Sequence, residues 1–173
     1  MSSTTPVPTK LSLSTTLVAT GAAFAVFVVA RPHPVTAGFA APFLWLFSFL
    51  FLVRVGGQLV VRLRRPGWLP PTEEWNLTPY RLLLPTQVVI LAIMAWIDVS
   101  FSLDRGVPVD PRPGLGKGVL VFSGVYAGAM ALRYVVRMRR RPAQRWFGGT
   151  IPIVFHQVLA AYLVVLGGFH ASH

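Results

Sequence analysis

Long apolar segments recur along this chain, and they constrain its fold more than any other feature of the sequence. Only 12% of the residues are charged, about half the share usual in soluble domains. Five segments are long enough to cross about 30 Å of hydrocarbon at about 1.5 Å of helical rise per residue. They cover residues 11–30, 40–61, 82–101, 119–136 and 151–168. We therefore predict an all-α membrane protein, a single domain built as a bundle of about five transmembrane helices.

The segments outside these spans are short. Residues 1–10 are expected to form a disordered N-terminus, and residues 169–173 an external tail. The third connection, residues 104–118, is rich in Gly and Pro and is expected to be irregular, so that Gly114, Gly116 and Gly118 would belong to a flexible connector.

The first apolar segment also resembles a signal peptide. Its opening turn is polar, and Val28, Val29 and Ala30 would make a small-residue cleavage site. However, its apolar stretch is long for a signal peptide, and Lys10 is the only charge before it. We therefore expect this helix to be retained.

Basic residues are unevenly distributed among the connections between the spans. The second and fourth connections contain most of them, whereas the first contains only Arg31 and the third offsets its basic residues with Asp104 and Asp110. Because Lys and Arg favour cytoplasmic loops, we predict that the N-terminus is inside and the C-terminus outside. The net charge of +11 then reflects topology and not nucleic-acid binding. Fourteen of the sixteen basic residues are Arg, which suggests a GC-rich bacterial genome and hence the bacterial cytoplasmic (inner) membrane.

Arginines at the inner ends of the second and fourth spans are expected to bind the headgroups of anionic lipid. Each basic residue near a membrane surface contributes about 1 kcal/mol to such binding. The residues concerned are Arg62, Arg64, Arg65, Arg137, Arg139, Arg140 and Arg141.

Polar side chains interrupt four spans at one depth, in the inner third of the membrane. An Arg at the centre of a span costs about 2.5–3.5 kcal/mol on insertion scales, so these groups should face the bundle interior or a wet cavity. They are Arg54, Gln58, Gln87, Arg133, His156 and Gln157.

Two interpretations of this cluster compete. In one, the side chains line a cytoplasm-facing pocket for a quinone or for a prenyl or lipid phosphate, where Arg would hold an oxygen and His156 would transfer a proton. In the other, Arg133 and Arg137 reach the lipid phosphates, the Gln residues bond between helices, and Arg54 pairs with Glu73 or Glu74 of the second connection. We favour the second, although it explains Arg54 least well.

The fourth span contains the pair Gly124 and Gly128, spaced so that both lie on one helix face. Small residues at this spacing let two helix backbones approach closely in lipid. The pair would contact a partner subunit or a second copy of the chain, or it would pack within this bundle, which we favour.

Three of the four histidines are expected at the outer face: His33, His170 and His173. Imidazoles suit zinc, copper or nickel, so these three are candidate metal ligands, with Asp98 or Asp104 as a fourth. His156 alone could ligate a haem or chlorophyll metal, but the spans provide no second histidine at its depth, and the cofactor is left unknown.

The sequence does not indicate a specific reaction. It contains no cysteine, which excludes disulfides, Cys-ligated metals and a thiolate nucleophile, and it lacks hydrolase, metalloprotease and nucleotide-binding motifs. We therefore expect a non-catalytic accessory or assembly subunit that packs against other membrane helices and contacts anionic lipid at its cytoplasmic rim. The alternative is a membrane-embedded binding protein or enzyme that uses the Arg/Gln/His pocket.

Overall fold

The computed structural model of the chain describes residues 8–64, 83–140 and 151–173, and these contain helices and no strand. A single 3₁₀ turn, η2 (Val107–Val109), lies between the third and fourth helices. The five α-helices are α1 (Pro8–Ala30), α2 (Ala37–Arg64), α3 (Leu83–Ser102), α4 (Pro113–Arg140) and α5 (Ile151–Ala171). The prediction of an all-α fold is confirmed. Four of the helices, α2 to α5, are long and apolar enough to span a membrane, whereas the apolar part identified in α1, Thr15–Ala30, is shorter.

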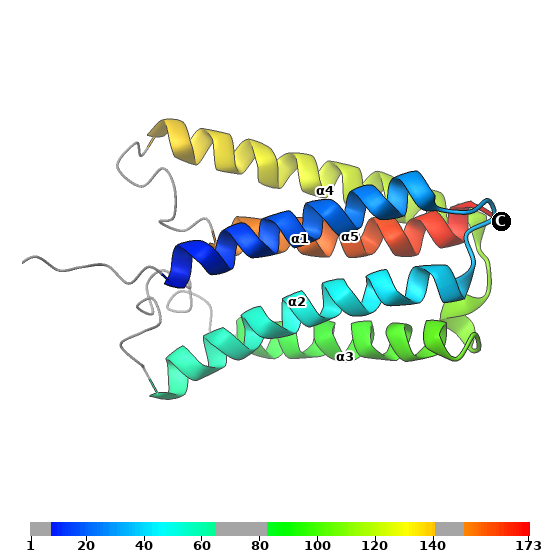
Figure 1. Cartoon of the computed structure of the whole chain (residues 1–173), viewed down its shortest axis with the longest axis horizontal. Helices are drawn as coiled ribbons and strands as arrows, with labels where there is room; N and C mark the ends of the chain where they lie inside the picture. The colour runs from blue at the N-terminus through cyan, green and yellow to red at the C-terminus, as the bar shows by residue number, and fades with distance from the viewer. Residues whose placement is uncertain (1–7, 65–82, 141–150) are drawn as a thin grey trace, which may run out of the picture.

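The helices run back and forth along the long axis of the molecule, each antiparallel to the one before it (Figure 1). The start of α1 and the ends of α2 and α4 lie at one end of the bundle, which we call the inner end. The connections 31–36 and 103–112 and the end of α5 lie at the other, the outer end. Both basic helix ends, at Arg64 and Arg140, are therefore at the inner end.

The centre of the bundle is α5, which contacts α1, α2 and α4, while α2 also contacts α3. In the most apolar part of α5, 67% of the residues are buried, against 6% in α4. Among the described helices, α4 therefore packs mainly on α5, and most of its surface contacts none of the others.

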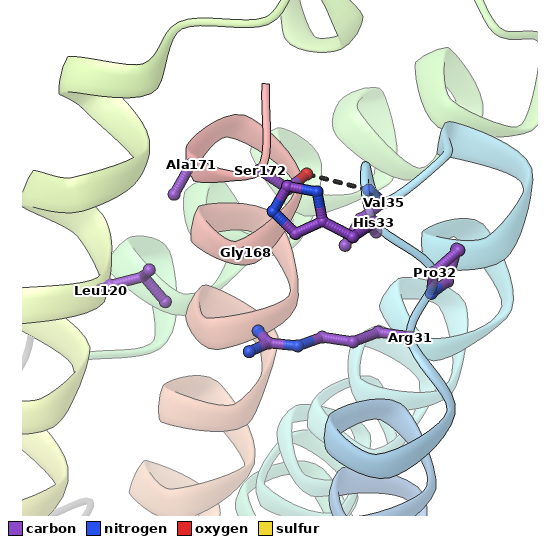
Figure 2. Close-up of a pocket in the computed structure, with 8 residues that line it drawn as sticks. All are labelled: Arg31, Pro32, His33, Val35, Leu120, Gly168, Ala171 and Ser172. Atoms are coloured by element: carbon purple, nitrogen blue, oxygen red, sulfur yellow. Dashed lines mark hydrogen bonds between the residues drawn. The ribbon is translucent and has the colours of Figure 1, made fainter.

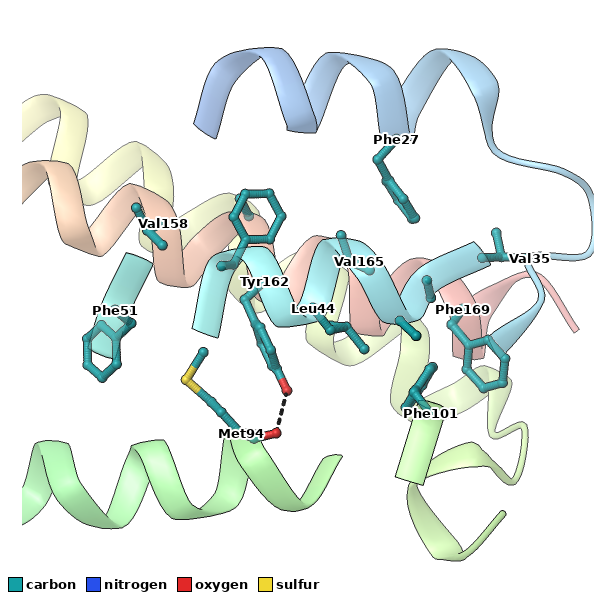
Figure 3. Packing of buried hydrophobic residues seen from close by; sticks show 14 of the residues in the cluster. Phe27, Val35, Leu44, Phe51, Met94, Phe101, Val158, Tyr162, Val165 and Phe169 are labelled. Atoms are coloured by element: carbon teal, nitrogen blue, oxygen red, sulfur yellow. Dashed lines mark hydrogen bonds between the residues drawn. The ribbon is translucent and has the colours of Figure 1, made fainter. Parts of the chain in front are cut away.

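The core fills the space between α2, α3 and α5 (Figure 3). Phe47, Val158 and Val165 are fully buried, and the rings of Phe101 and Phe169 meet edge to face at 4.7 Å. Many large apolar side chains elsewhere are exposed, as expected for a surface that faces lipid tails.

Helix α4 begins at Pro113, six residues before the predicted span, so the expected flexible connector at Gly114, Gly116 and Gly118 is wrong. Proline is favoured in the first turn of a helix because backbone N–H groups there have no acceptor within the helix, so its lack of an N–H costs nothing. Gly116 is buried against the last turn of α5, which gives this early start a tertiary contact.

Candidate functional site

One hydrogen bond fixes the relative level of the polar side chains on α2 and α3. The Trp45 Nε1 group donates to Ser102 Oγ across 2.8 Å near the outer end. Because the helices are antiparallel, a step along α2 corresponds to a step back along α3. Gln58 is thirteen residues inward of Trp45 on α2, so it is level with residue 89, thirteen residues inward of Ser102 on α3. Residue 89 is two residues from Gln87, so Gln58 and Gln87 are within about 3 Å of each other along the bundle axis.

Arg54 faces the bundle interior, as both interpretations of the polar cluster require. Its side chain is only 6% exposed, and its Cζ lies 5.1 Å from the centre of the Phe155 ring on α5, in cation–π contact. Its Nη1 atom has no hydrogen-bond partner among the described residues. Glu73 and Glu74, the predicted counter-charges, lie outside those residues.

Gln58 and Gln87 are buried polar groups without the expected interhelical bonds. Gln58 is completely buried, and neither its Nε2 nor its Oε1 atom has a partner within the described part of the chain. The Oε1 atom of Gln87 is also buried without a hydrogen-bond partner among the described residues. A buried polar group that is left unpaired costs about 1–3 kcal/mol, so the arrangement is costly unless another molecule supplies the bonds. We refer to Arg54, Gln58 and Gln87 as the inner polar cluster.

His156 and Gln157 point towards α4 and do not complete this cluster. The His156 Nδ1 atom and the Tyr126 hydroxyl are hydrogen-bonded. Gln157 Nε2 donates to the Ala127 carbonyl across 3.1 Å. These bonds hold α4 against α5. Arg133, the remaining member of the predicted set, is exposed.

The described contacts of the predicted set go to two different neighbours of α5. Phe155 contacts Arg54 of α2, whereas the adjacent His156 contacts α4. Sequence spacing gives the level of each residue along the helix axis, but it does not give the direction in which its side chain points. A pocket shared by all six side chains stays a prediction.

A second buried polar site was missed as such from the sequence. Asp98 on α3 is completely buried, and the Tyr162 hydroxyl on α5 donates to its Oδ1 atom across 3.1 Å. The same hydroxyl lies 3.4 Å from the Met94 carbonyl (Figure 3), and Ser48 on α2 is adjacent to the carboxyl group. Ser48, Asp98 and Tyr162 lie at the same level on three helices. This shared level was the sequence feature that could have predicted the site.

The Asp98 carboxyl and Arg54 are too far apart to pair. Ser48, at the level of Asp98, precedes Arg54 by six residues on α2, which is about 9 Å along the helix axis. Asp98 is therefore not the counter-charge of Arg54.

The glycine pair expected to pack within the bundle does not do so. A Cβ at Gly124 or Gly128 would meet nothing within 4 Å, and both residues are exposed. The close approach of α4 and α5 occurs instead at Gly116 and Gly167. The spacing was correctly identified as a small-residue face, but that face points away from the other described helices.

The outer histidines are not gathered into a metal site. The described residues contain no group of three His, Cys, Asp or Glu side chains that could hold a metal ion. His170 is buried beside the Asp110 backbone, whereas His33 is exposed. His173 packs on the Phe169 ring, with 5.1 Å between the ring centres.

The arginines predicted to contact lipid headgroups end α2 and α4. Arg64, Arg139 and Arg140 are exposed and Arg137 is half-buried. The Arg62 side chain, Arg65 and Arg141 lie outside the described residues. Lipid binding by these residues stays a prediction.

No family model matches this chain, and comparison with curated proteins and with solved structures finds no match either. The function of the protein has to be inferred from its own residues and their contacts.

Proposed function

We propose that this protein is a multi-pass protein of the bacterial cytoplasmic membrane that binds the phosphate group of an amphipathic ligand at its inner polar cluster. Its five helices would all span the membrane, with the N-terminus inside and the C-terminus outside. The position of Arg64 and Arg140 at one end of the bundle (Figure 1) supports this orientation, because positive residues favour the cytoplasmic side.

The observation that carries the binding proposal is Gln58, which is fully buried with both amide atoms unpaired among the described residues. Gln87 lies near its level, and Arg54 precedes Gln58 by four residues, or about 6 Å along the helix axis. The cluster offers amide and guanidinium N–H donors, and the described residues supply no carboxylate to it. Such a donor set suits an oxyanion.

A phosphate fits this cluster better than a quinone does. Arg54 carries a full charge, and a buried charge needs an opposite charge to offset its desolvation. A prenyl or lipid phosphate supplies that charge and an apolar chain, whereas a quinone carbonyl supplies only a hydrogen-bond acceptor.

The experiment measures binding of farnesyl phosphate to the purified protein in mild detergent, with decylubiquinone as the alternative probe. Arg54→Met is expected to weaken farnesyl phosphate binding about tenfold or more, since a hydrogen bond to a charged group contributes about 1.5–3 kcal/mol. Arg105→Gln, an exposed charge at the outer end, is the matched control and should bind normally.

The stability of the ligand-free variant separates binding from a structural ion pair. If Arg54 lacks a counter-charge until ligand binds, replacement by Met should leave the ligand-free protein as stable or more stable. A large loss of stability in Arg54→Met, reproduced by Glu73→Gln with Glu74→Gln, would instead indicate the predicted Arg–Glu pair. Unchanged binding in Arg54→Met, or preferential binding of decylubiquinone, would contradict the proposal.

The exposed face of α4 favours a second function, that of a membrane subunit. Gly124 and Gly128 lie on a helix whose contacts with the other described helices are concentrated on α5. We propose that this face packs against a transmembrane helix of another subunit, where the absence of side chains allows close contact. The arginines at the inner end would hold anionic lipid around the same assembly.

Purification in mild detergent tests the subunit role. Gly124→Leu with Gly128→Leu is expected to release a stoichiometric partner, whereas Val125→Leu, also exposed on α4, should retain it. Disulfide cross-linking of Gly124→Cys to itself would identify the partner as a second copy, since the chain has no other cysteine. Purification of the wild-type protein as a monomer without partners would exclude this role.

A further inference from the structure

A cavity of about 220 Å³ lies at the outer end of the bundle, remote from the inner polar cluster. The connection between α1 and α2, the last turns of α5 and one residue of α4 form its walls (Figure 2). Helices α1 and α4 both contact α5 but do not pack closely on each other. The cavity therefore opens between them, at the level where the outer headgroups of a membrane would lie.

Arg31 and His33 line this cavity, and the charge of Arg31 is not paired within the described structure. Arg31 extends across the last turns of α5 at Gly168, with Nη1 3.9 Å from the position that a Cβ on residue 168 would occupy (Figure 2). The described residues provide no carboxylate partner for this guanidinium, and none of the lining residues is acidic. The imidazole of His33, on the same connection, also lines the cavity.

The remaining wall combines a fixed polar frame with an apolar side. Ser172 Oγ accepts a hydrogen bond from the Val35 N–H across 2.9 Å and lies 2.9 Å from the Phe169 carbonyl, so the connection is attached to the end of α5. Leu120 and Val35 provide apolar surface. The cavity thus presents a guanidinium and an imidazole to one part of a ligand and hydrocarbon to another.

We propose that this cavity binds the phosphate group of an anionic phospholipid from the outer leaflet. The guanidinium of Arg31 holds the phosphate oxygens with paired N–H donors, the geometry in which Arg binds phosphate, and His33 adds a further donor. The acyl chains leave the cavity between α1 and α4. A lipid with a cationic headgroup is disfavoured because Arg31 repels it.

Native mass spectrometry of the full chain in mild detergent measures this binding, with phosphatidylglycerol as the probe and phosphatidylcholine as the comparison. Arg31→Gln and His33→Gln are each expected to weaken one phosphatidylglycerol adduct, the former about tenfold, equivalent to about 1.4 kcal/mol. Arg105→Gln, which removes an exposed charge at the same end without touching the cavity, should leave the adduct unchanged. Arg54→Met should also leave it unchanged, which separates this site from the inner polar cluster.

A single cysteine provides a second measurement that keeps both Arg31 and His33 in place. In Pro32→Cys, which introduces the only thiol of the chain, phosphatidylglycerol is expected to slow labelling by a soluble maleimide more than phosphatidylcholine does. Equal protection by the two lipids would overturn the proposal. Displacement of phosphatidylglycerol by millimolar inorganic phosphate would mean that the site binds the free ion. Unchanged phosphatidylglycerol adducts in Arg31→Gln would mean that Arg31 only caps the helix ends. Either result would refute the lipid site.

Discussion

Gly116 gives the sharpest test of how α4 is held to the bundle. A Cβ on this residue would lie 2.3 Å from the Ala171 amide nitrogen, 2.7 Å from the His170 carbonyl carbon and 2.8 Å from the Ala171 Cα. All three are backbone atoms, which cannot rotate away as a flexible side chain can. Gly116→Ala therefore requires α4 and α5 to separate at the outer end.

The cost of that separation follows from what the two helices share. Overpacking of a well-packed contact costs about 1–3 kcal/mol. Because α4 has no other close neighbour among the described helices, a movement at Gly116 is not resisted by a second contact. This movement is expected to weaken the hydrogen bond that Ser123, seven residues after Gly116 on α4, donates from its Oγ to the Ala160 carbonyl of α5.

Gly118→Ala is the matched control, since a Cβ there would meet nothing within 4 Å. The same chemical change, two residues away on the same helix, should stabilise it by about 0.5–1 kcal/mol through lower backbone entropy. The two variants are thus expected to change the unfolding free energy in opposite directions. Thermal or detergent unfolding of the purified protein, followed by circular dichroism, measures both. Equal stability of the two variants would refute the tight α4–α5 contact.

Three further predictions concern the polar contacts and the topology. Tyr162→Phe removes the donor to Asp98 Oδ1 and is expected to lower the unfolding free energy by about 1 kcal/mol, while Asp98→Asn, which keeps an acceptor, should lose less; no loss in Tyr162→Phe would contradict the bond. Tyr126→Phe and His156→Phe should be non-additive in a double-mutant cycle by about 0.6 kcal/mol, the average for such bonds in membranes, and strict additivity would argue against the pair. Because the chain has no cysteine, Asp104→Cys and Arg139→Cys report sidedness directly, and a membrane-impermeant maleimide should label only the former from outside; the reverse labelling would invert the proposed orientation.

The level of a residue along its helix could be predicted from the sequence, but helix rotation could not. The inner end of α2 and the polar residues Arg54, Gln58 and Gln87 follow from apolar segment length and a rise of 1.5 Å per residue. Which helix each side chain faces depends on packing between segments far apart in the sequence. For this reason the sequence predicted an interhelical bond for Gln157 but could not identify its acceptor, which is the Ala127 carbonyl of α4.

The glycines illustrate the same limit. Gly124 and Gly128 have the spacing typical of a helix contact, yet they are exposed. Gly116 lies in a segment whose Gly and Pro content predicts an irregular connector, yet it is helical and packs directly against the backbone of α5. Local composition describes what a segment permits, and the partner decides which glycine is used.

The relation between Asp98 and Arg54 bears on whether the inner polar cluster holds a ligand. A bundle can neutralise two buried charges cheaply by placing them within about 4 Å, where their attraction offsets much of the desolvation. Here Asp98 is bonded to Tyr162 at one level, and Arg54 lies about 9 Å away along the axis. Asp98 is thus engaged elsewhere, and Gln58, with no charge to neutralise, is unpaired beside Arg54 as well. A loop carboxylate would neutralise the charge of Arg54, but Gln58 and Gln87 would then compete with Arg54 for its two oxygens. A phosphate has enough oxygen atoms for all three side chains. Because all three side chains need a hydrogen-bond acceptor, we propose a phosphate-bearing ligand at the inner polar cluster.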